Sequence, residues 1–153
     1  MRLLEHRIPP PIVAAAAAFA MWELARSSQS IDMGATVRNG LMLLTLIAGL
    51  AFTLGGIVSF RRANTTVNPL KPRQATALVT SGVYRLSRNP MYVGMLWLLL
   101  AWGFYLGSPL AFLPIPLFIW YISRYQITPE ERALLDLFGT EFQAYRARVR
   151  RWL

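Results

Sequence analysis

A stretch of charged, aromatic and amide side chains lies at the start of an apolar segment of this chain. Residues 82–92 read Gly-Val-Tyr-Arg-Leu-Ser-Arg-Asn-Pro-Met-Tyr. Asn89 followed by Pro90 is typical of a helix start, because Asn caps helices well and Pro fits their first turn. A helix N-terminus presents free N–H groups that bind carboxylates or phosphates, and Arg88 beside it would strengthen such binding. The stretch therefore predicts a helix start that could bind an anionic ligand.

The neighbouring residues have structural interpretations as well as functional ones. Arg85 and Arg88 could anchor the chain at the cytoplasmic face of a membrane, and Tyr84 and Tyr92 could belong to an interfacial aromatic belt. Aromatic faces also attract cationic ligands. The four side chains lie closer together than anchoring alone requires, so we retain both interpretations.

Two adjacent acids, Glu130 and Glu131, follow the last long apolar segment. The sequence Thr-Pro-Glu-Glu that begins at Thr128 predicts a capping box, in which Thr caps a helix and the acids complement its dipole. A carboxylate here could also accept hydrogen bonds from a ligand's hydroxyl or ammonium groups. We expect Glu130 to lie on the same side of the membrane as Arg88.

The composition restricts the kinds of site that this chain can hold. Its 153 residues suffice for one domain, and 55% apolar with only 15% charged residues is typical of a membrane protein. The chain has no cysteine, and its one histidine is His6, which excludes thiolate or His-cluster metal sites and a catalytic triad. The net charge of +9 lies mainly in loops that flank apolar segments, which favours positive cytoplasmic loops over nucleic-acid binding. We therefore expect neither a metal nor a nucleic acid as a partner.

Four apolar segments predict an all-α, polytopic fold with about four transmembrane helices. A helical hairpin is expected in the C-terminal half, because Gly-Ser-Pro at 107–109 can end one helix and begin the next. The expected spans are 11–24, 41–60, 91–106 and 110–125. In a single membrane domain, 1–153, these give two N-terminal spans in 1–60, a basic cytoplasmic loop at 61–90, the hairpin at 91–125 and an interfacial helical tail at 126–153.

Smaller features refine this arrangement. Ala51 and Gly55 form a pair of small residues that would let a neighbouring helix approach the second span. Pro114 and Pro116 are expected to bend the fourth helix, and Gly139 to interrupt the tail. Apolar residues recur every three or four positions from Phe138 to Trp152, which predicts a helix lying on the membrane surface. An even number of spans with arginine-rich loops places both termini in the cytoplasm, and we expect a prokaryotic inner membrane.

The ordered set of motifs resembles the isoprenylcysteine carboxyl methyltransferases and the wider group that includes the phospholipid methyltransferases. The resemblance covers about residues 65–150. It rests on Thr-Ser-Gly-Val-Tyr from Thr80, Arg-Asn-Pro-Met-Tyr-Val-Gly from Arg88, the acid pair, and Phe-Gly-x-Glu-Phe-x-x-Tyr-x-x-x-Val from Phe138. It implies an integral-membrane enzyme that transfers a methyl group from S-adenosylmethionine to a lipophilic or lipidated substrate from the bilayer, with carboxyl O-methylation favoured.

The resemblance also implies roles for individual residues. Arg88 and Arg124 are expected to be catalytic, with Arg124 orienting a carboxylate acceptor. Gln126 takes the position where the family's substrate-binding arginine is expected. The implied cofactor contacts are Leu78, Val79, Tyr84, Asn89, Pro90, Met91, Tyr92 and Glu130.

Two departures keep other functions open. The carboxyl methyltransferases usually have His where this chain has Asn89, and Asn-Pro-Met-Tyr is more like the phospholipid N-methyltransferases, which are the first alternative. Gln126 in place of arginine also leaves the acceptor open. A membrane sterol-type reductase that uses NADPH and a non-catalytic membrane module are further alternatives. The sequence does not indicate an oligomeric state.

Overall fold

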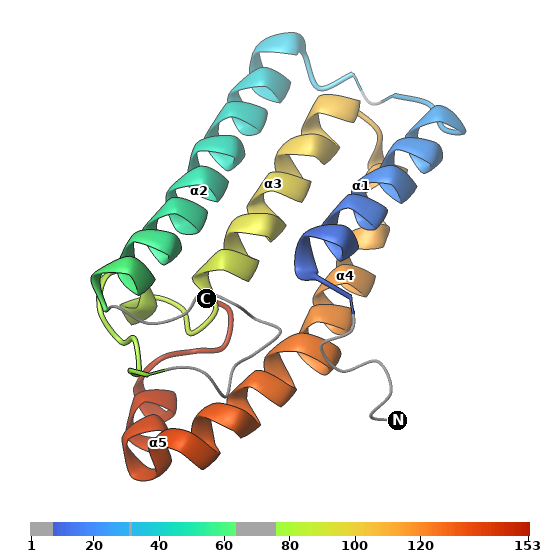
Figure 1. Ribbon diagram of the computed structural model, residues 1–153. Coiled ribbons are helices and arrows are strands. Elements are labelled where there is room, and N and C mark those ends of the chain that lie inside the picture. The colour runs from blue at the N-terminus through green and yellow to red at the C-terminus, as the bar shows by residue number, and fades with distance from the viewer. Residues whose placement is uncertain (1–7, 31, 64–75) are drawn as a thin grey trace.

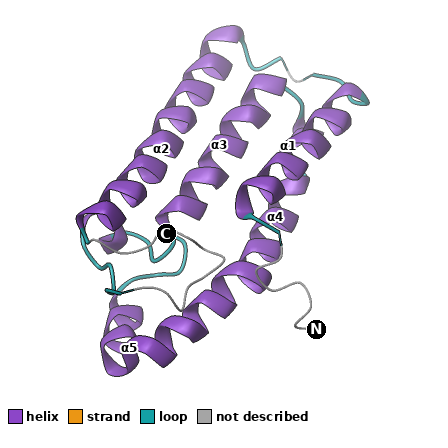
Figure 2. Ribbon diagram, viewed as in Figure 1, coloured by secondary structure: helices purple, strands orange, loops and turns teal. Residues whose placement is uncertain are grey.

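The computed structural model describes residues 8–30, 32–63 and 76–153, and everything regular in these ranges is helical (Figure 2). The all-α prediction is confirmed for this part of the chain. Residues 64–75 of the expected basic loop, which include Lys71 and Arg73, lie outside the described residues, as does His6. The helices are α1 (Pro10–Arg26), α2 (Ala35–Arg62), α3 (Pro90–Leu106), α4 (Pro114–Ile122) and α5 (Thr128–Arg148).

Three short segments connect or extend these helices. Two are 3₁₀ turns, η2 (Gly82–Arg85) before α3 and η3 (Pro109–Phe112) before α4. The third, η4 (Ser123–Ile127), is a π-helical segment between α4 and α5. Figure 1 shows α1 to α4 side by side, with α5 continuing from α4 across their lower end.

Glycines allow α2 and α3 to pack closely. A Cβ at Gly49 would lie 2.9 Å from Leu98 Cγ, and one at Gly94 would lie 2.9 Å from the Gly49 carbonyl oxygen. Gly56 lies against Met91 at the start of α3. The expectation that Ala51 and Gly55 form the close-packing pair is therefore wrong. Ala51 is exposed, and Gly55 faces Val83 of η2 instead of a neighbouring helix.

An apolar cluster joins α1, α3 and α4. Its fully buried members include Met21, Phe118 and Ile122, and Leu99 of α3 packs with them. The indole Nε1 of Trp102 donates a hydrogen bond to the Ala18 carbonyl oxygen at 3.0 Å, which ties α3 to α1. These contacts hold the N-terminal end of α3 and the C-terminal end of α4 at the same end of the bundle.

Large apolar side chains cover the outer surface of the bundle. Leu44 is 64% exposed on α2, Phe19 61% on α1 and Leu117 64% on α4. Exposed apolar surface on this scale is unusual for a soluble monomer and favours a membrane environment. Among the described helices, only α2 is long and apolar enough to cross a membrane by itself, and α3 is a shorter apolar helix of 17 residues. The four-span topology therefore stays a prediction.

The connection from α3 to α4 follows the expected turn in part. Gly107 ends α3 with φ of 65°, a conformation that favours glycine, and Pro109 begins η3. Ser108 does not cap the next helix, because its hydroxyl pairs with that of Ser28 after α1. The expected bend at Pro114 is wrong. Pro114 begins α4, where its missing N–H is not needed.

The expected capping box at Thr128 is also wrong. Ile127 and Thr128 already have right-handed helical dihedrals, so the chain enters α5 directly from η4 with no cap. The Thr128 hydroxyl instead donates to the Ser123 carbonyl oxygen at 2.7 Å. Pro129 lacks an N–H and crowds the preceding turn of a helix, and the wider π segment before it relieves both problems. The result is one continuous helical rod from Pro114 into α5.

The tail beyond this rod is folded back onto the body. Gly139, with φ of 47° and ψ of −119°, breaks α5 as expected. Phe142 and Tyr145, two members of the predicted surface stripe, are buried at 1% and 4% exposure. The stripe does not continue as a helix to Trp152, because the backbone becomes extended at Val149. The last residues consequently turn toward the start of α3.

Candidate functional site

Asn89 and Pro90 begin α3 as the sequence predicts, but Asn89 does not use its side chain as a cap. Asn89 occupies the N-cap position, and its carbonyl oxygen accepts the first helical bonds from Tyr92 and Val93, both at 3.0 Å. Its amide Nδ2 donates to the Arg151 carbonyl oxygen at 2.8 Å. The helix start is therefore linked to the C-terminal end of the chain.

Tyr92 and Glu130 form a direct contact between α3 and α5. The Tyr92 hydroxyl donates to Glu130 Oε1 at 2.5 Å. Tyr92 is 6% exposed, and Tyr84 is equally buried just before α3. The two tyrosines and the carboxylate, all predicted to bind a ligand, are thus brought into one polar cluster.

Burial shifts the titration of this cluster. It raises the pKa of Glu130 to about 8; the Tyr92 hydrogen bond lowers it, and the nearby charge of Glu131 raises it further. Burial also raises the pKa of Tyr84, with smaller contributions from Tyr145 and Glu130. The phenols stay protonated, and Glu130 holds a proton across much of the neutral range.

The raised pKa of Glu130 predicts a pH-dependent stability. The folded protein binds a proton there up to about pH 8, whereas the unfolded chain releases it near pH 4.5, so stability is lost as pH rises between these values. Glu130→Gln mimics the protonated acid. We expect the melting temperature of wild type to fall below that of Glu130→Gln as pH rises from 5 to 8, measured by circular dichroism. Parallel profiles for the two proteins would contradict a raised pKa.

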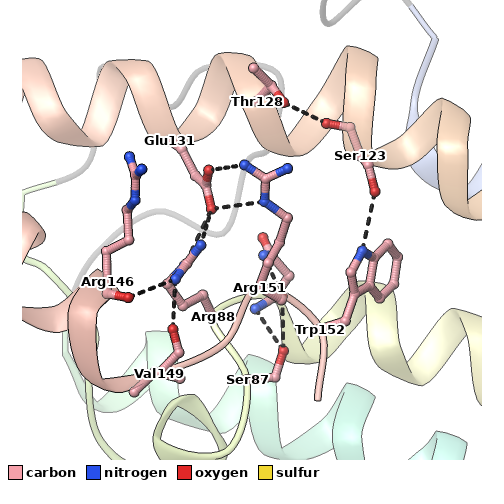
Figure 3. A network of polar contacts seen from close by, with 10 residues as sticks. Ser87, Arg88, Ser123, Thr128, Glu131, Arg146, Val149, Arg151 and Trp152 are labelled. Carbon is pink, nitrogen blue, oxygen red and sulfur yellow. Dashed lines mark hydrogen bonds and ion pairs between the residues drawn. The ribbon is translucent and has the colours of Figure 1, made fainter.

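Arg88 is held by five hydrogen bonds to the C-terminal part of the chain (Figure 3). Its Nε and Nη2 donate to Glu131 Oε1 at 3.2 and 2.7 Å. Its Nη1 donates to the carbonyl oxygens of Arg146 and Val149 at 3.0 and 2.6 Å. The backbone N–H of Arg88 donates to Arg150 at 3.0 Å. The structure therefore places this guanidinium, expected to be catalytic, in a joint between α3 and the tail.

Glu131 lies between two arginines, as Figure 3 shows. Arg151 Nη2 contacts Glu131 Oε2 at 2.5 Å, opposite the contact that Arg88 makes. Burial opposes the charged form, but hydrogen bonds from Arg151 and then Arg88 outweigh it and lower the pKa of Glu131. Glu131 is therefore a charged partner of Arg88 and Arg151, whereas its neighbour Glu130 can hold a proton beside Tyr92.

The last five residues, 149–153, form what we call the C-terminal strap. Ser87 Oγ donates to the Arg151 carbonyl oxygen at 3.3 Å, and Trp152 Nε1 donates to Ser123 Oγ at 3.1 Å. The Tyr145 hydroxyl, just before the strap, donates to the Tyr84 carbonyl oxygen at 2.7 Å. The strap thus lies against the start of α3.

Gln126 and Arg124 lie on different sides of η4. Gln126 is fully buried, and its Nε2 donates to the Ile8 carbonyl oxygen at 2.8 Å. Its Oε1 is buried without a hydrogen-bond partner among the residues that the structure describes. Arg124 is exposed, with its guanidinium 5.8 Å from the ring centre of Tyr125. The structure does not bring these two residues together.

The remaining predicted cofactor contacts lie in the segment before η2 and at the start of α3. Val79 is buried and Leu78 half-buried in the segment that precedes η2. Pro90 is fully buried, and Met91 packs against Gly56 of α2. Sequence reasoning missed the roles of Arg151, Trp152 and Ser87. One signal was available for Arg151, since a chain with only seven acids is expected to pair its buried carboxylates with arginines.

Comparison with known proteins supports a methyltransferase. The sequence pattern of the family described as "Phospholipid methyltransferase" matches residues 37–141, more than half of the chain. A "Protein-S-isoprenylcysteine O-methyltransferase" of Schizosaccharomyces pombe is 36% identical over 47% of this chain and 30% of its own length. A "Probable protein-S-isoprenylcysteine O-methyltransferase" of Oryza sativa is 31% identical over 70% of this chain and 56% of its own length.

These matches have different extents. An uncharacterized protein of Haemophilus influenzae is 46% identical over 63 residues, which are 41% of this chain and all of that protein. The chain spans between a quarter and just over half the length of the isoprenylcysteine methyltransferases that it matches. No solved structure matches the chain.

Proposed function

Because the chain belongs to the phospholipid methyltransferase family, we propose that it transfers a methyl group from S-adenosylmethionine to a lipophilic acceptor. The observation that supports this most directly is the cluster of buried Tyr84 and Tyr92 with half-buried Glu130 at the start of α3. In our proposal all spans and the tail form one membrane domain, with both termini in the cytoplasm of a prokaryotic cell. The reductase alternative has no support from the matches.

The residues of the cluster fit the chemistry of such a methyl donor. The donor would supply an electrophilic methyl group on a sulfonium ion. The faces of Tyr84 and Tyr92 attract a cation, and Glu130 accepts hydrogen bonds from hydroxyl or ammonium groups. Leu78, Val79, Pro90 and Met91 would exclude water around the donor, because all four side chains are apolar and all are at least half-buried. Exclusion of water and alignment of the two reactants are the main means by which these residues would accelerate the transfer.

Arg88 acts as a positioning residue in this proposal. Its guanidinium is engaged by Glu131 and by backbone carbonyl oxygens, so it fixes α5 against α3 and thereby sets Glu130 against Tyr92. Asn89 contributes to the same joint through its amide.

A carboxylate is the first candidate for the acceptor, by analogy with the relatives named above. Such an acceptor needs orientation but no general base. Arg124 would have to turn inward to provide that orientation, because it is exposed beside Tyr125.

An amine of a phospholipid headgroup is the second candidate, and Gln126 favours it. This side chain is fully buried and neutral, and its Oε1 has no partner in the described part of the chain. This carbonyl oxygen accepts hydrogen bonds from an amine or a hydroxyl, whereas a carboxylate offers it no donor.

Binding of the methyl donor tests the proposal first. We expect S-adenosylhomocysteine to bind wild type, and Glu130→Ala to weaken this binding by at least about 100-fold, because the ligand's hydroxyl or ammonium groups lose their acceptor and the buried Tyr92 hydroxyl is left unpaired. Isothermal titration in detergent provides the measurement. Glu141→Ala, which removes an exposed acid from the same helix, is the matched control. Unchanged affinity in folded Glu130→Ala would reject the role of Glu130.

The product distinguishes the two acceptors. A methyl ester releases radioactive methanol in alkali, whereas an N-methyl group does not. Incubation with tritiated S-adenosylmethionine and extracted lipids, or with a prenylated cysteine, therefore assigns the acceptor class. Absence of methyl transfer to any of these substrates, despite donor binding, would favour the non-catalytic alternative.

A further inference from the structure

The hydrogen-bond donors at the start of α3 are occupied by the chain itself. The backbone N–H of Arg88 donates to Arg150, and the Asn89 amide and the Ser87 hydroxyl both donate to the carbonyl oxygen of Arg151. A carbonyl oxygen carries partial negative charge and suits the positive end of a helix. The C-terminal strap therefore fills the place where a helix start of this kind would receive an anionic group.

Side chains fasten the strap over these donors. Arg151 pairs with Glu131 at 2.5 Å, and Trp152 donates to Ser123 at 3.1 Å (Figure 3). The fastening is partly exposed to solvent, since the Arg151 side chain is 38% exposed whereas that of Arg88 is only 10% exposed. Exposed ion pairs contribute little to stability, so the Arg151 contact holds the strap less firmly than buried Arg88 holds Val149 at 2.6 Å.

The fold permits the strap to detach alone. α5 ends at Arg148, and Val149 is extended with φ of −121° and ψ of 133°. Release of the strap breaks the hydrogen bonds that Arg88 donates to Val149 and Arg150, but its guanidinium keeps Glu131 and the Arg146 carbonyl oxygen as partners, so no buried charge loses its last partner. Release of five residues therefore leaves the helices and the Tyr92–Glu130 contact intact.

We propose that the C-terminal strap is an autoinhibitory closure, which must leave the start of α3 before the carboxylate of the methyl donor binds to Asn89 and the backbone N–H of Arg88. This inference rests on the proposed function. Each N–H group at the start of α3 can bind either a carbonyl oxygen of the strap or the carboxylate of the ligand, so the strap and the ligand compete for it. The apparent affinity for the ligand is therefore the intrinsic affinity multiplied by the fraction of molecules in which the strap is open.

The test measures strap mobility and ligand binding separately. The chain has no cysteine, so Leu153→Cys, at a position 52% exposed, accepts a single nitroxide label whose mobility is read by electron paramagnetic resonance. The label is introduced into wild type and into Arg151→Ala, which loosens the strap but keeps its backbone carbonyl oxygens. Arg148→Ala, an exposed arginine three residues away, is the matched control for loss of charge. Trp152→Phe loosens the other fastening and keeps the ring.

We expect saturating S-adenosylhomocysteine to mobilise the label in wild type. Arg151→Ala and Trp152→Phe should be mobile without ligand, and Arg151→Ala should bind the ligand about ten-fold more tightly than wild type, with Arg148→Ala unchanged. A label that stays immobile with ligand bound, or equal or weaker binding by Arg151→Ala, would overturn the inference while leaving the proposed function in place. If neither wild type nor Arg151→Ala binds the ligand, both the proposed function and the strap inference are rejected.

Discussion

Glu131→Gln should lower the free energy of unfolding by about 3 kcal/mol, because breaking a buried ion pair leaves the remaining charge uncompensated. Glu131 lies between two arginines, and the side chain of Arg88 is only 10% exposed. Glutamine keeps the shape of the side chain but not its charge, so Arg88 would remain buried with backbone carbonyl oxygens as its main partners. Denaturant unfolding in detergent micelles, followed by circular dichroism, measures the loss.

Glu141→Gln provides the matched comparison for this prediction. Glu141 is exposed on the same helix, and its replacement should change the unfolding free energy by less than about 0.5 kcal/mol. Acidification should act on wild type in the same direction as Glu131→Gln. The lowered pKa of Glu131 contributes stability above pH 4.5 that is lost as the pH falls through the folded-state pKa. Equal unfolding free energies for the two variants would show that the carboxylate is not a structural partner of Arg88.

Gly94→Ala should destabilise the protein by about 3 kcal/mol through the contact between α2 and α3. A Cβ at this position would collide with Thr53 Oγ1, and would lie 2.9 Å from the Gly49 carbonyl oxygen and 3.0 Å from the Thr53 backbone nitrogen. Two of these atoms belong to the backbone of α2, so the helices must separate to accept the methyl group. The thermal midpoint in detergent is the simplest measurement.

Gly40→Ala is the control, because it makes the same change in a helix where nothing lies within 4 Å. There we expect stabilisation of up to about 1 kcal/mol, since alanine favours the helix more than glycine does. Opposite signs for the two variants would support close packing at Gly94. If Gly94→Ala were as stable as Gly40→Ala, the two helices would have to lie further apart than in the structure.

Features encoded by local sequence were predictable. The start of α3 at Pro90, its end at Gly107 and the break at Gly139 each depend on the conformational limits of one or two residues. The partnership of Tyr92 with the acid pair followed from placing both at the same end of a hairpin. The roles of individual site residues in binding stay predictions.

Features that depend on contacts between distant segments were missed. Thr128 carries the right sequence for a cap, but α4 arrives already helical and removes the need for one. The apolar stripe of the tail predicted a surface helix, yet Phe142 and Tyr145 are buried against the body. Arg151 falls within that predicted surface helix, whereas the extended backbone at Val149 turns it toward Glu131. No local pattern indicates which of several arginines a buried acid selects.

The π-helical segment η4 joins α4 to α5 without a loop, so the direction in which Glu130 and Glu131 point depends on the orientation of α4. Residues 114–138 run without a loop, so the angle at which Glu130 faces Tyr92 is set by the way α4 packs in the bundle. One residue more or less in a helix turns everything after it by about 100°. The wider π-helical turn of η4 therefore sets the rotation of α5 about its axis. With an ordinary α-helical turn in its place, α5 would present a different face to α3.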